Sequence, residues 1–162
     1  MRASSFLLLA LSFCLLSSAQ AERLLHHNTD LSRSIGYPFS EAVQVGSTLY
    51  LSGQVGNIPG STTLVEGGVA AQTEQVLKNI KAILERNGSD MPHVAKCTLF
   101  LADINDWPAV NEIYRRHFRA PYPARSALAT SGLALGAAVE IECIGVVREP
   151  ETASILAQPA PR

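Results

Sequence analysis

The sequence has few of the residues that hold small domains together covalently or through a metal ion. It contains three cysteines, and only Cys97 and Cys143 lie beyond the apolar N-terminal segment. Two thiols are too few for a disulfide framework, and their separation fits no zinc-binding pattern. The four histidines include no His-x-His or His-x3-His pair, the usual arrangement for holding a metal. We therefore predict that the protein binds no metal.

Cys97 and Cys143 both lie inside apolar stretches that alternate like β-strands. Free cysteine is among the most buried residue types, so this setting favours two buried, unreactive thiols. A single disulfide is the alternative, because export to an oxidising compartment would permit one.

Positive charge is also scarce. Thirteen Lys and Arg residues stand against 14 Asp and Glu, which gives a formal net charge of −1, and no basic run occurs. Binding to nucleic acid depends largely on neutralising backbone phosphates with Lys and Arg. The composition therefore makes nucleic acid a poor candidate partner.

The apolar run near the N-terminus is too short to cross a bilayer. It extends from Phe6 to Leu16, whereas a spanning helix needs about 20 apolar residues. Arg2 precedes it, and Ala19-Gln20-Ala21 fits the small-x-small rule for signal peptidase. We expect residues 1–21 to be a signal peptide and the remainder to be exported, to a periplasm or outside the cell, without stable membrane insertion. A single membrane anchor is the alternative.

The remaining residues, 22–162, alternate between strand and helix patterns. We expect a flexible segment at 22–34, one domain at 35–148, and a flexible Pro-, Ala- and Ser-rich tail at 149–162. Helices are expected where apolar residues recur every three to four positions, and strands where they alternate or run continuously. Two strands around a turn are predicted at 42–51, helices at 69–86 and about 107–118, and further strands at 93–101, from 126 to 129, and at 139–147.

This order of elements predicts an α+β domain, a mixed sheet with both helices packed on one face. The last strand is apolar on both sides, with Val139, Ile141 and Cys143 pointing one way and Ile144 and Val146 the other. A single domain of this size has no second layer to cover the other face. We therefore expect a homo-oligomer that buries it.

Arg125 opens a run of small and apolar residues, "PARSALATSGLALGAAVEIECIGVV", which ends in a strand carrying Glu140 and Glu142. The two glutamates project to the same face, and Glu140 is expected to lie deeper, next to the entrance of the strand at Ser126. A guanidinium at a strand entrance is suited to holding a carboxylate through two hydrogen bonds, and a nearby glutamate could place a water molecule. From the spacing alone, the alternative is that Arg125 and one of these glutamates form a structural ion pair at a subunit interface.

Five segments in this order resemble the RidA family of reactive enamine/imine deaminases, formerly called YjgF. They are "LYLSGQVG", "AAQTEQVLKNIKAILE", "KCTLFLADINDWPAVNEIY", "YPARSAL" and "VEIECIGVV". The resemblance covers roughly residues 35–148, and P-A-R-S and V-E-I-E are its more specific marks. It implies a chorismate-mutase-like fold, a homotrimer, and a site in each cleft between subunits.

The resemblance also implies roles for individual residues. Arg125 would bind the substrate carboxylate, Glu140 would position the water, and main-chain groups of Ser126 and Ala127 would line the pocket. Ser52 and Asn111 would line the same cleft; alternatively, Ser52 only closes a strand and Asn111 caps a helix or faces solvent. The implied reaction hydrolyses a 2-imino or 2-enamino acid to a 2-oxo acid and ammonia. It requires no metal, organic cofactor or covalent nucleophile.

Two departures from the family pattern bear on activity. Many active relatives have a tyrosine where this chain has Phe39, with Tyr37 two positions earlier, and a cysteine where it has Ala127. Export also separates the protein from the mainly intracellular enzymes that make aminoacrylate. The alternative hypothesis is therefore a non-catalytic trimer that binds small carboxylates such as 2-oxo acids. A ribonuclease is a more distant hypothesis, because of the weakly acidic charge balance.

Overall fold

All the strands among the described residues belong to one mixed sheet. The structure is a computed structural model and describes residues 23–148. The strands are β1 Leu24–His27, β2 Ala42–Val45, β3 Thr48–Leu51, β4 Gln54–Val55, β5 Val94–Leu101, β6 Ala124–Ala129 and β7 Val139–Val146. The α-helices are α1 Asp30–Ile35, α2 Gly68–Arg86 and α3 Trp107–His117, and short 3-10 turns lie at Met91–His93, Ile104–Asp106 and Ala134–Gly136.

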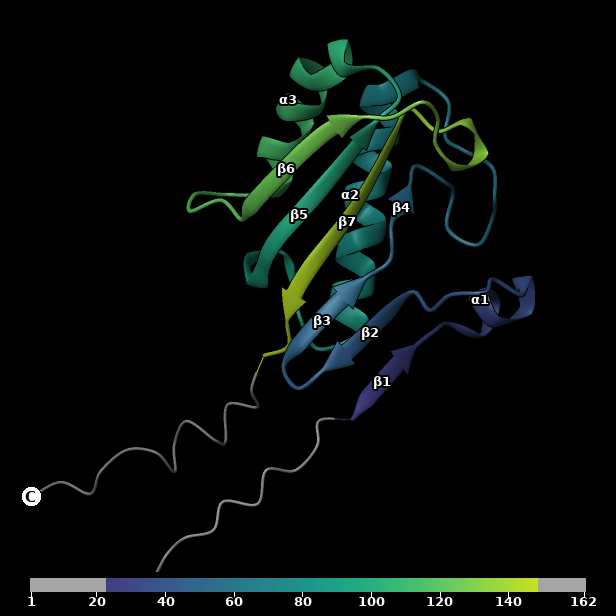
Figure 1. Cartoon of the computed structure of the whole chain (residues 1–162), viewed down its shortest axis with the longest axis vertical. Coiled ribbons are helices and arrows are strands. Elements are labelled where there is room, and N and C mark those ends of the chain that lie inside the picture. The colour runs from purple at the N-terminus through teal and green to yellow at the C-terminus, as the bar shows by residue number, and fades with distance from the viewer. Residues whose placement is uncertain (1–22, 149–162) are drawn as a thin grey trace, which may run out of the picture.

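The strand order is β1-β2-β3-β7-β5-β6, with β4 pairing with the part of β7 beyond β3. Figure 1 shows β7 at the centre of this sheet, with β5 on one side and β3 and β4 on the other. Neighbouring strands are antiparallel except for β5 and β6, which are parallel and joined through α3. The predicted α+β class with a mixed sheet is confirmed.

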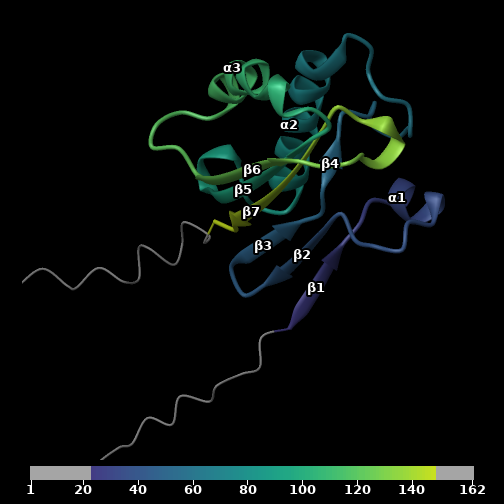
Figure 2. The same ribbon diagram turned by 45° about the horizontal axis from the view of Figure 1, so that its top comes forward.

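Helices α2 and α3 lie on the same face of the sheet, as predicted (Figure 2). The apolar stripe of α2 is buried from Val76 to Leu84, and the strands present alternate residues to it. The helix ends at Arg86. Its C-cap is Asn87, whose side-chain amide donates to the carbonyl of Ile83 at 2.7 Å, and Gly88 follows with a positive φ of 75°. The largest fully buried side chains include Leu49, Val76, Leu77, Ile80, Leu84, Leu99, Leu101, Val110, Val139 and Ile141.

Helix α3 begins at Trp107, with Pro108 in its first turn. Asp103 accepts from the backbone N–H of Asn105 at 2.9 Å, in the 3-10 turn that leads into the helix. Asp106 makes no side-chain cap hydrogen bond, because its backbone is already helical.

The other face of the sheet, here called the open face, is covered by neither α2 nor α3 (Figure 2). Tyr50, Leu128 and Val146 are 48%, 44% and 38% exposed on it. Along β7, Val139, Ile141 and Cys143 are buried while the residues between them are half-buried or exposed. The prediction of apolar residues on both sides of this strand is confirmed.

Residues 24–35 are more structured than the flexible segment expected at 22–34. Strand β1 pairs antiparallel with β2, with Leu24 opposite Val45. Thr29 caps α1 by accepting from the N–H of Ser32 at 3.1 Å, and its hydroxyl donates to Glu41 at 2.7 Å. Glu41 in turn pairs with Arg86 of α2 at 2.6 Å. These contacts tie the segment to the domain through partners far away in the sequence, which a local pattern cannot reveal.

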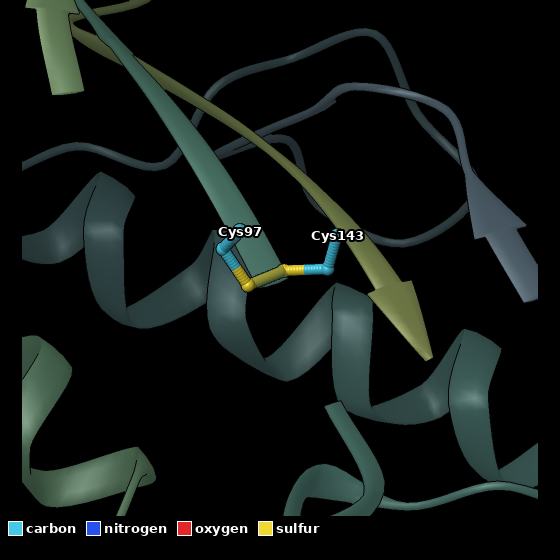
Figure 3. Close-up of a disulfide and its surroundings, with 2 residues drawn as sticks. All are labelled: Cys97 and Cys143. Carbon is cyan, nitrogen blue, oxygen red and sulfur yellow. A yellow bond between two sulfur atoms is a disulfide. The ribbon is translucent and has the colours of Figure 1, made fainter. Parts of the chain in front are cut away.

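The expectation of two free thiols is wrong. Cys97 and Cys143 form a disulfide with an S–S distance of 1.99 Å (Figure 3). The residues lie directly opposite each other on β5 and β7, with their Cα atoms 4.1 Å apart. Both are buried, at 0% and 2% exposure, as predicted. The sequence revealed two buried strands but not that they are neighbours in this register, and only the register brings the sulfurs together.

The expected signal peptide at 1–21 and tail at 149–162 lie outside the described residues. Within 23–148, no helix has the length and apolar character needed to cross a membrane.

Candidate functional site

Arg125 lies on β6, at the edge of the sheet, and points toward α3. It is level with Cys97 in the parallel pairing of β5 and β6, and Cys97 faces the helices. The guanidinium carbon of Arg125 lies 4.9 Å from the ring centroid of Tyr114 and 5.7 Å from that of Trp107. A guanidinium stacked over aromatic faces keeps its N–H edges available for a ligand.

No carboxylate of residues 23–148 lies within 4.0 Å of the Arg125 guanidinium. The side chain is half-buried, and a charge in such a place usually has a counterion. Within the described chain, Arg125 therefore forms no ion pair with a glutamate; the alternative of an ion pair at a subunit interface stays a prediction. The cation can accept an anionic ligand.

Glu140 lies on the open face of β7, opposite Phe100 of β5. It is half-buried, whereas Glu142 on the same face is exposed, so the prediction that Glu140 lies deeper is confirmed. Burial raises the pKa of the Glu140 carboxyl, and the negative charge of Glu142 adds to the effect.

Gly53 makes room for the Glu140 carboxylate. It lies in the two-residue break between β3 and β4, where the chain continues along β7. A Cβ atom at Gly53 would lie 1.9 Å from Oε1 of Glu140. Only glycine permits this close approach of a backbone to a side chain.

Arg125 and Glu140 lie on opposite faces of the same sheet. The residues of β5 that are level with them, Cys97 and Phe100, are three positions apart, about 10 Å along a strand. Ser126 of β6 pairs with Thr98 of β5, and Thr98 pairs with Glu142 of β7, so Glu142 is the glutamate that is level with Ser126. The expectation that Glu140 lies beside the entrance of this strand is therefore wrong within one chain. The pleat separates the two residues, and the sequence alone does not show which face β6 turns toward α3.

Asn111 lies on the same stripe of α3 as Trp107 and Tyr114, four residues after one and three before the other. The structure therefore brings Asn111 to the side of the domain that carries Arg125. Ala127 is packed against the core on this side, whereas Ser126 is exposed on the opposite face of the strand.

Ser52 is hydrogen-bonded to the backbone of the segment that follows Phe39. Its hydroxyl donates to the carbonyl of Ser40 at 2.7 Å, and its N–H donates to the carbonyl of Glu41 at 3.0 Å. Phe39 is 53% exposed, and its ring stacks on that of Tyr37, with centroids 5.0 Å apart. The two aromatic residues singled out in the sequence are therefore side by side.

Trp107 and Tyr114 were missed by the sequence reasoning, although both touch the Arg125 guanidinium. Their spacing of seven places them on one helix face, which was the available signal. Tyr114 is only 4% exposed, and its hydroxyl has no hydrogen-bond partner among the described residues. Burial raises the pKa of Tyr114 to about 12, and the nearby charge of Arg125 opposes this shift.

A hollow of about 180 Å³ lies on the open face, between β3, β7 and β5. Its lining includes Tyr50, Lys96, Thr98, Glu142 and Ile144, and neither Arg125 nor Glu140. Within residues 23–148, no three His, Cys, Asp or Glu side chains gather as a metal site would require.

Comparison with known proteins adds to this geometry. The family model described as "Endoribonuclease L-PSP" matches residues 33–147. A human protein named 2-iminobutanoate/2-iminopropanoate deaminase is 46% identical over 118 residues, which is 73% of this chain and 86% of that protein.

Two solved structures have the same fold. RidA from the Antarctic bacterium Psychrobacter sp. PAMC 21119 gives a TM-score of 0.67 at 38% identity, covering 79% of this chain and 99% of that one. YyfA of the Rid protein family, from Yersinia pestis, gives 0.72 at 39% identity, covering 77% and 100%.

Proposed function

The chain belongs to the RidA family, whose family model is described as Endoribonuclease L-PSP, and on this basis we propose that it is an imine deaminase. It hydrolyses reactive 2-imino and 2-enamino acids to 2-oxo acids and ammonia. The relative named 2-iminobutanoate/2-iminopropanoate deaminase supports this chemistry. The observation that carries the proposal is Arg125, a half-buried cation with no carboxylate partner among the described residues.

In the proposed reaction, Arg125 holds the substrate carboxylate through two charge-assisted hydrogen bonds. A water oxygen attacks the imine carbon and gives a carbinolamine. The nitrogen then leaves as ammonia, the C–N bond breaks and the C=O bond of the 2-oxo acid forms. The imine carbon is already electrophilic, so much of the catalysis is orientation of substrate and water.

Glu140 is proposed to position that water and to carry its proton to the departing nitrogen. Burial and the neighbouring Glu142 raise the pKa of the Glu140 carboxyl. A carboxylate with a raised pKa is a stronger base and returns its proton at a pH closer to neutral. Phe39, Ser52 and Asn111, with main-chain groups of Ser126 and Ala127, are proposed to line the cleft.

The proposed site is shared between two copies of the chain. Arg125 and Glu140 lie on opposite faces of one sheet, so a single chain cannot apply both to one substrate molecule. A homotrimer in which the helix-side edge of one subunit meets the open face of the next would join them. The same assembly would cover Tyr50, Leu128 and Val146.

We also propose that the chain is exported. The pattern of residues 1–21 supports a signal peptide. The Cys97–Cys143 disulfide gives independent support, because such bonds persist mainly in oxidising compartments. The substrate would then be an imine formed outside the cytosol, for example by oxidation of an amino acid.

The test uses an amino-acid oxidase to generate imino acids and semicarbazide to trap what remains of them. Purified wild-type protein should suppress the trapped product. Arg125→Ala should lose about a hundredfold or more in kcat/KM, since two hydrogen bonds to a charged group are removed. A folded wild type that suppresses no trapped product would exclude deamination and favour the carboxylate-binding trimer, whereas equal suppression by both folded proteins would exclude the role of Arg125.

A further inference from the structure

We propose that Trp107 is a positioning residue for Arg125, holding the guanidinium in the orientation that receives the substrate carboxylate. Tyr114 forms the inner wall of this aromatic support and Trp107 the outer wall. The proposal rests on the proposed role of Arg125 as carboxylate ligand. It adds a residue that acts through Arg125 and touches neither the water nor the imine.

The need for support follows from the place of Arg125 in the sheet. It lies on β6, which has a neighbour on one side only among the described strands. No carboxylate of the described chain fixes its guanidinium. A free arginine side chain samples many rotamers, and each one lost on ligand binding weakens the affinity.

The two rings supply the missing restraint. They come from one face of α3, seven residues apart, which is about 10 Å along a helix axis. The guanidinium carbon lies 4.9 Å from the Tyr114 centroid and 5.7 Å from the Trp107 centroid. Both distances fall within the range of attraction between a cation and a ring face. Contact through the ring faces leaves the N–H edge free for the carboxylate.

The two rings differ in what else they do. Tyr114 is 4% exposed and packs against Phe118, with the two rings tilted and their centroids 4.4 Å apart, so it is part of the core. Trp107 is 37% exposed at the start of α3. A change at Trp107 therefore alters the support for Arg125 with little effect on the core, which makes it the informative position.

The experiment compares Trp107→Leu with Trp107→Phe. Leucine keeps an apolar side chain but has no π face, whereas phenylalanine keeps a weaker one. In Trp107→Leu we expect KM for the imino acid, and Kd for 2-oxobutanoate measured by calorimetry, to rise about three- to tenfold. In Trp107→Phe the rise should be about twofold, and kcat should change little in either variant.

Ile104→Ala is the matched control, because it removes a comparably exposed apolar side chain just before α3. It should leave Kd unchanged. Equal Kd values in wild type and Trp107→Leu, or equal losses in the Leu and Phe variants, would overturn the proposal. If the wild type binds 2-oxobutanoate but turns over no imine, the deaminase function fails while the Kd comparison still tests Trp107.

Discussion

At the scale of single residues, the candidate site consists of two charges in contrasting surroundings. Arg125 is supported by aromatic rings and has no carboxylate partner among the described residues. Glu140 has a like charge nearby and lies against the bare backbone of Gly53. A half-buried cation without a carboxylate partner and a carboxyl with a raised pKa each cost folding stability, and each suits a group that acts on a ligand.

Glu140→Gln should lower turnover by about a hundredfold or more, because the amide cannot accept a proton from water. The Kd for a 2-oxo acid should change little, since Arg125 remains. Unchanged turnover would show that Glu140 is not the base.

The same variant should be more stable than the wild type at neutral pH. The pKa of Glu140 is higher in the folded chain than its ordinary value, so its contribution to stability is present below pH of about 4.5 and lost as pH rises through the folded pKa. Glutamine carries no charge at any pH, so the variant avoids the destabilisation that ionised Glu140 causes in the folded chain. Thermal unfolding should show a higher midpoint for Glu140→Gln at pH 7 and no difference at pH 4. A lower midpoint at pH 7 would contradict the assigned environment.

Gly53→Ala should reduce turnover through Glu140. The added Cβ would lie 1.9 Å from the Glu140 Oε1, so the carboxylate must move. Gly132→Ala is the matched control, because nothing lies within 4 Å of a Cβ there. Combining Gly53→Ala with Glu140→Gln should add little further loss in kcat; additive losses would show that Gly53 acts independently.

The charged residues of the site could be predicted from the sequence, and their neighbours could not. Arg125 stands out at the head of a small, apolar run, and Glu140 by its place in an apolar strand. Trp107 and Tyr114 contact Arg125 only because α3 packs beside β6. Gly53 approaches Glu140 only because β4 pairs with β7. These contacts depend on how elements pack, which local patterns do not encode.

At the scale of elements, β5 and β7 are the two longest strands of the described sheet, and they pair with each other. Their disulfide lies in the same row as Arg125, since Cys97 is level with Arg125 on one side and Cys143 on the other. The bond therefore fixes the register between the strand that pairs with β6 and the strand that carries Glu140.

Replacing both cysteines by alanine should destabilise the chain by up to about 4 kcal/mol, the loop-entropy value for a separation of 46 residues. Denaturant unfolding with and without reductant measures it. The wild type should lose stability in reductant, and the double variant should not respond to it. A wild type that is equally stable in reductant would show that the disulfide does not form.

The long elements and the hairpin of β2 and β3 could be predicted from the sequence, whereas β1 and α1 could not. Helix α2 has an apolar stripe over nineteen residues, and its expected and observed bounds differ by one residue. Strand β1 has four residues and α1 has six, too short for a periodic signal to stand out. Their stability comes from β2, Glu41 and Arg86, which are distant in the sequence.

At the scale of the whole molecule, one chain has a sheet face with exposed apolar side chains. It also carries Arg125 and Glu140, the two charged residues of the proposed site, on opposite faces of the sheet. The proposed assembly, in which each site takes Arg125 from one subunit and Glu140 from its neighbour, would account for both features. The central claim is therefore that activity belongs to the assembly and not to the single chain.

Mixing two inactive variants tests this claim most directly. Arg125→Ala and Glu140→Gln are unfolded and refolded together in equal amounts, and each is also refolded alone. If sites are shared, about a quarter of those in randomly mixed oligomers combine an intact Arg125 with an intact Glu140. Imine hydrolysis should then return to about a quarter of the wild-type rate. Mixed oligomers that remain as inactive as either variant alone would contradict the shared site.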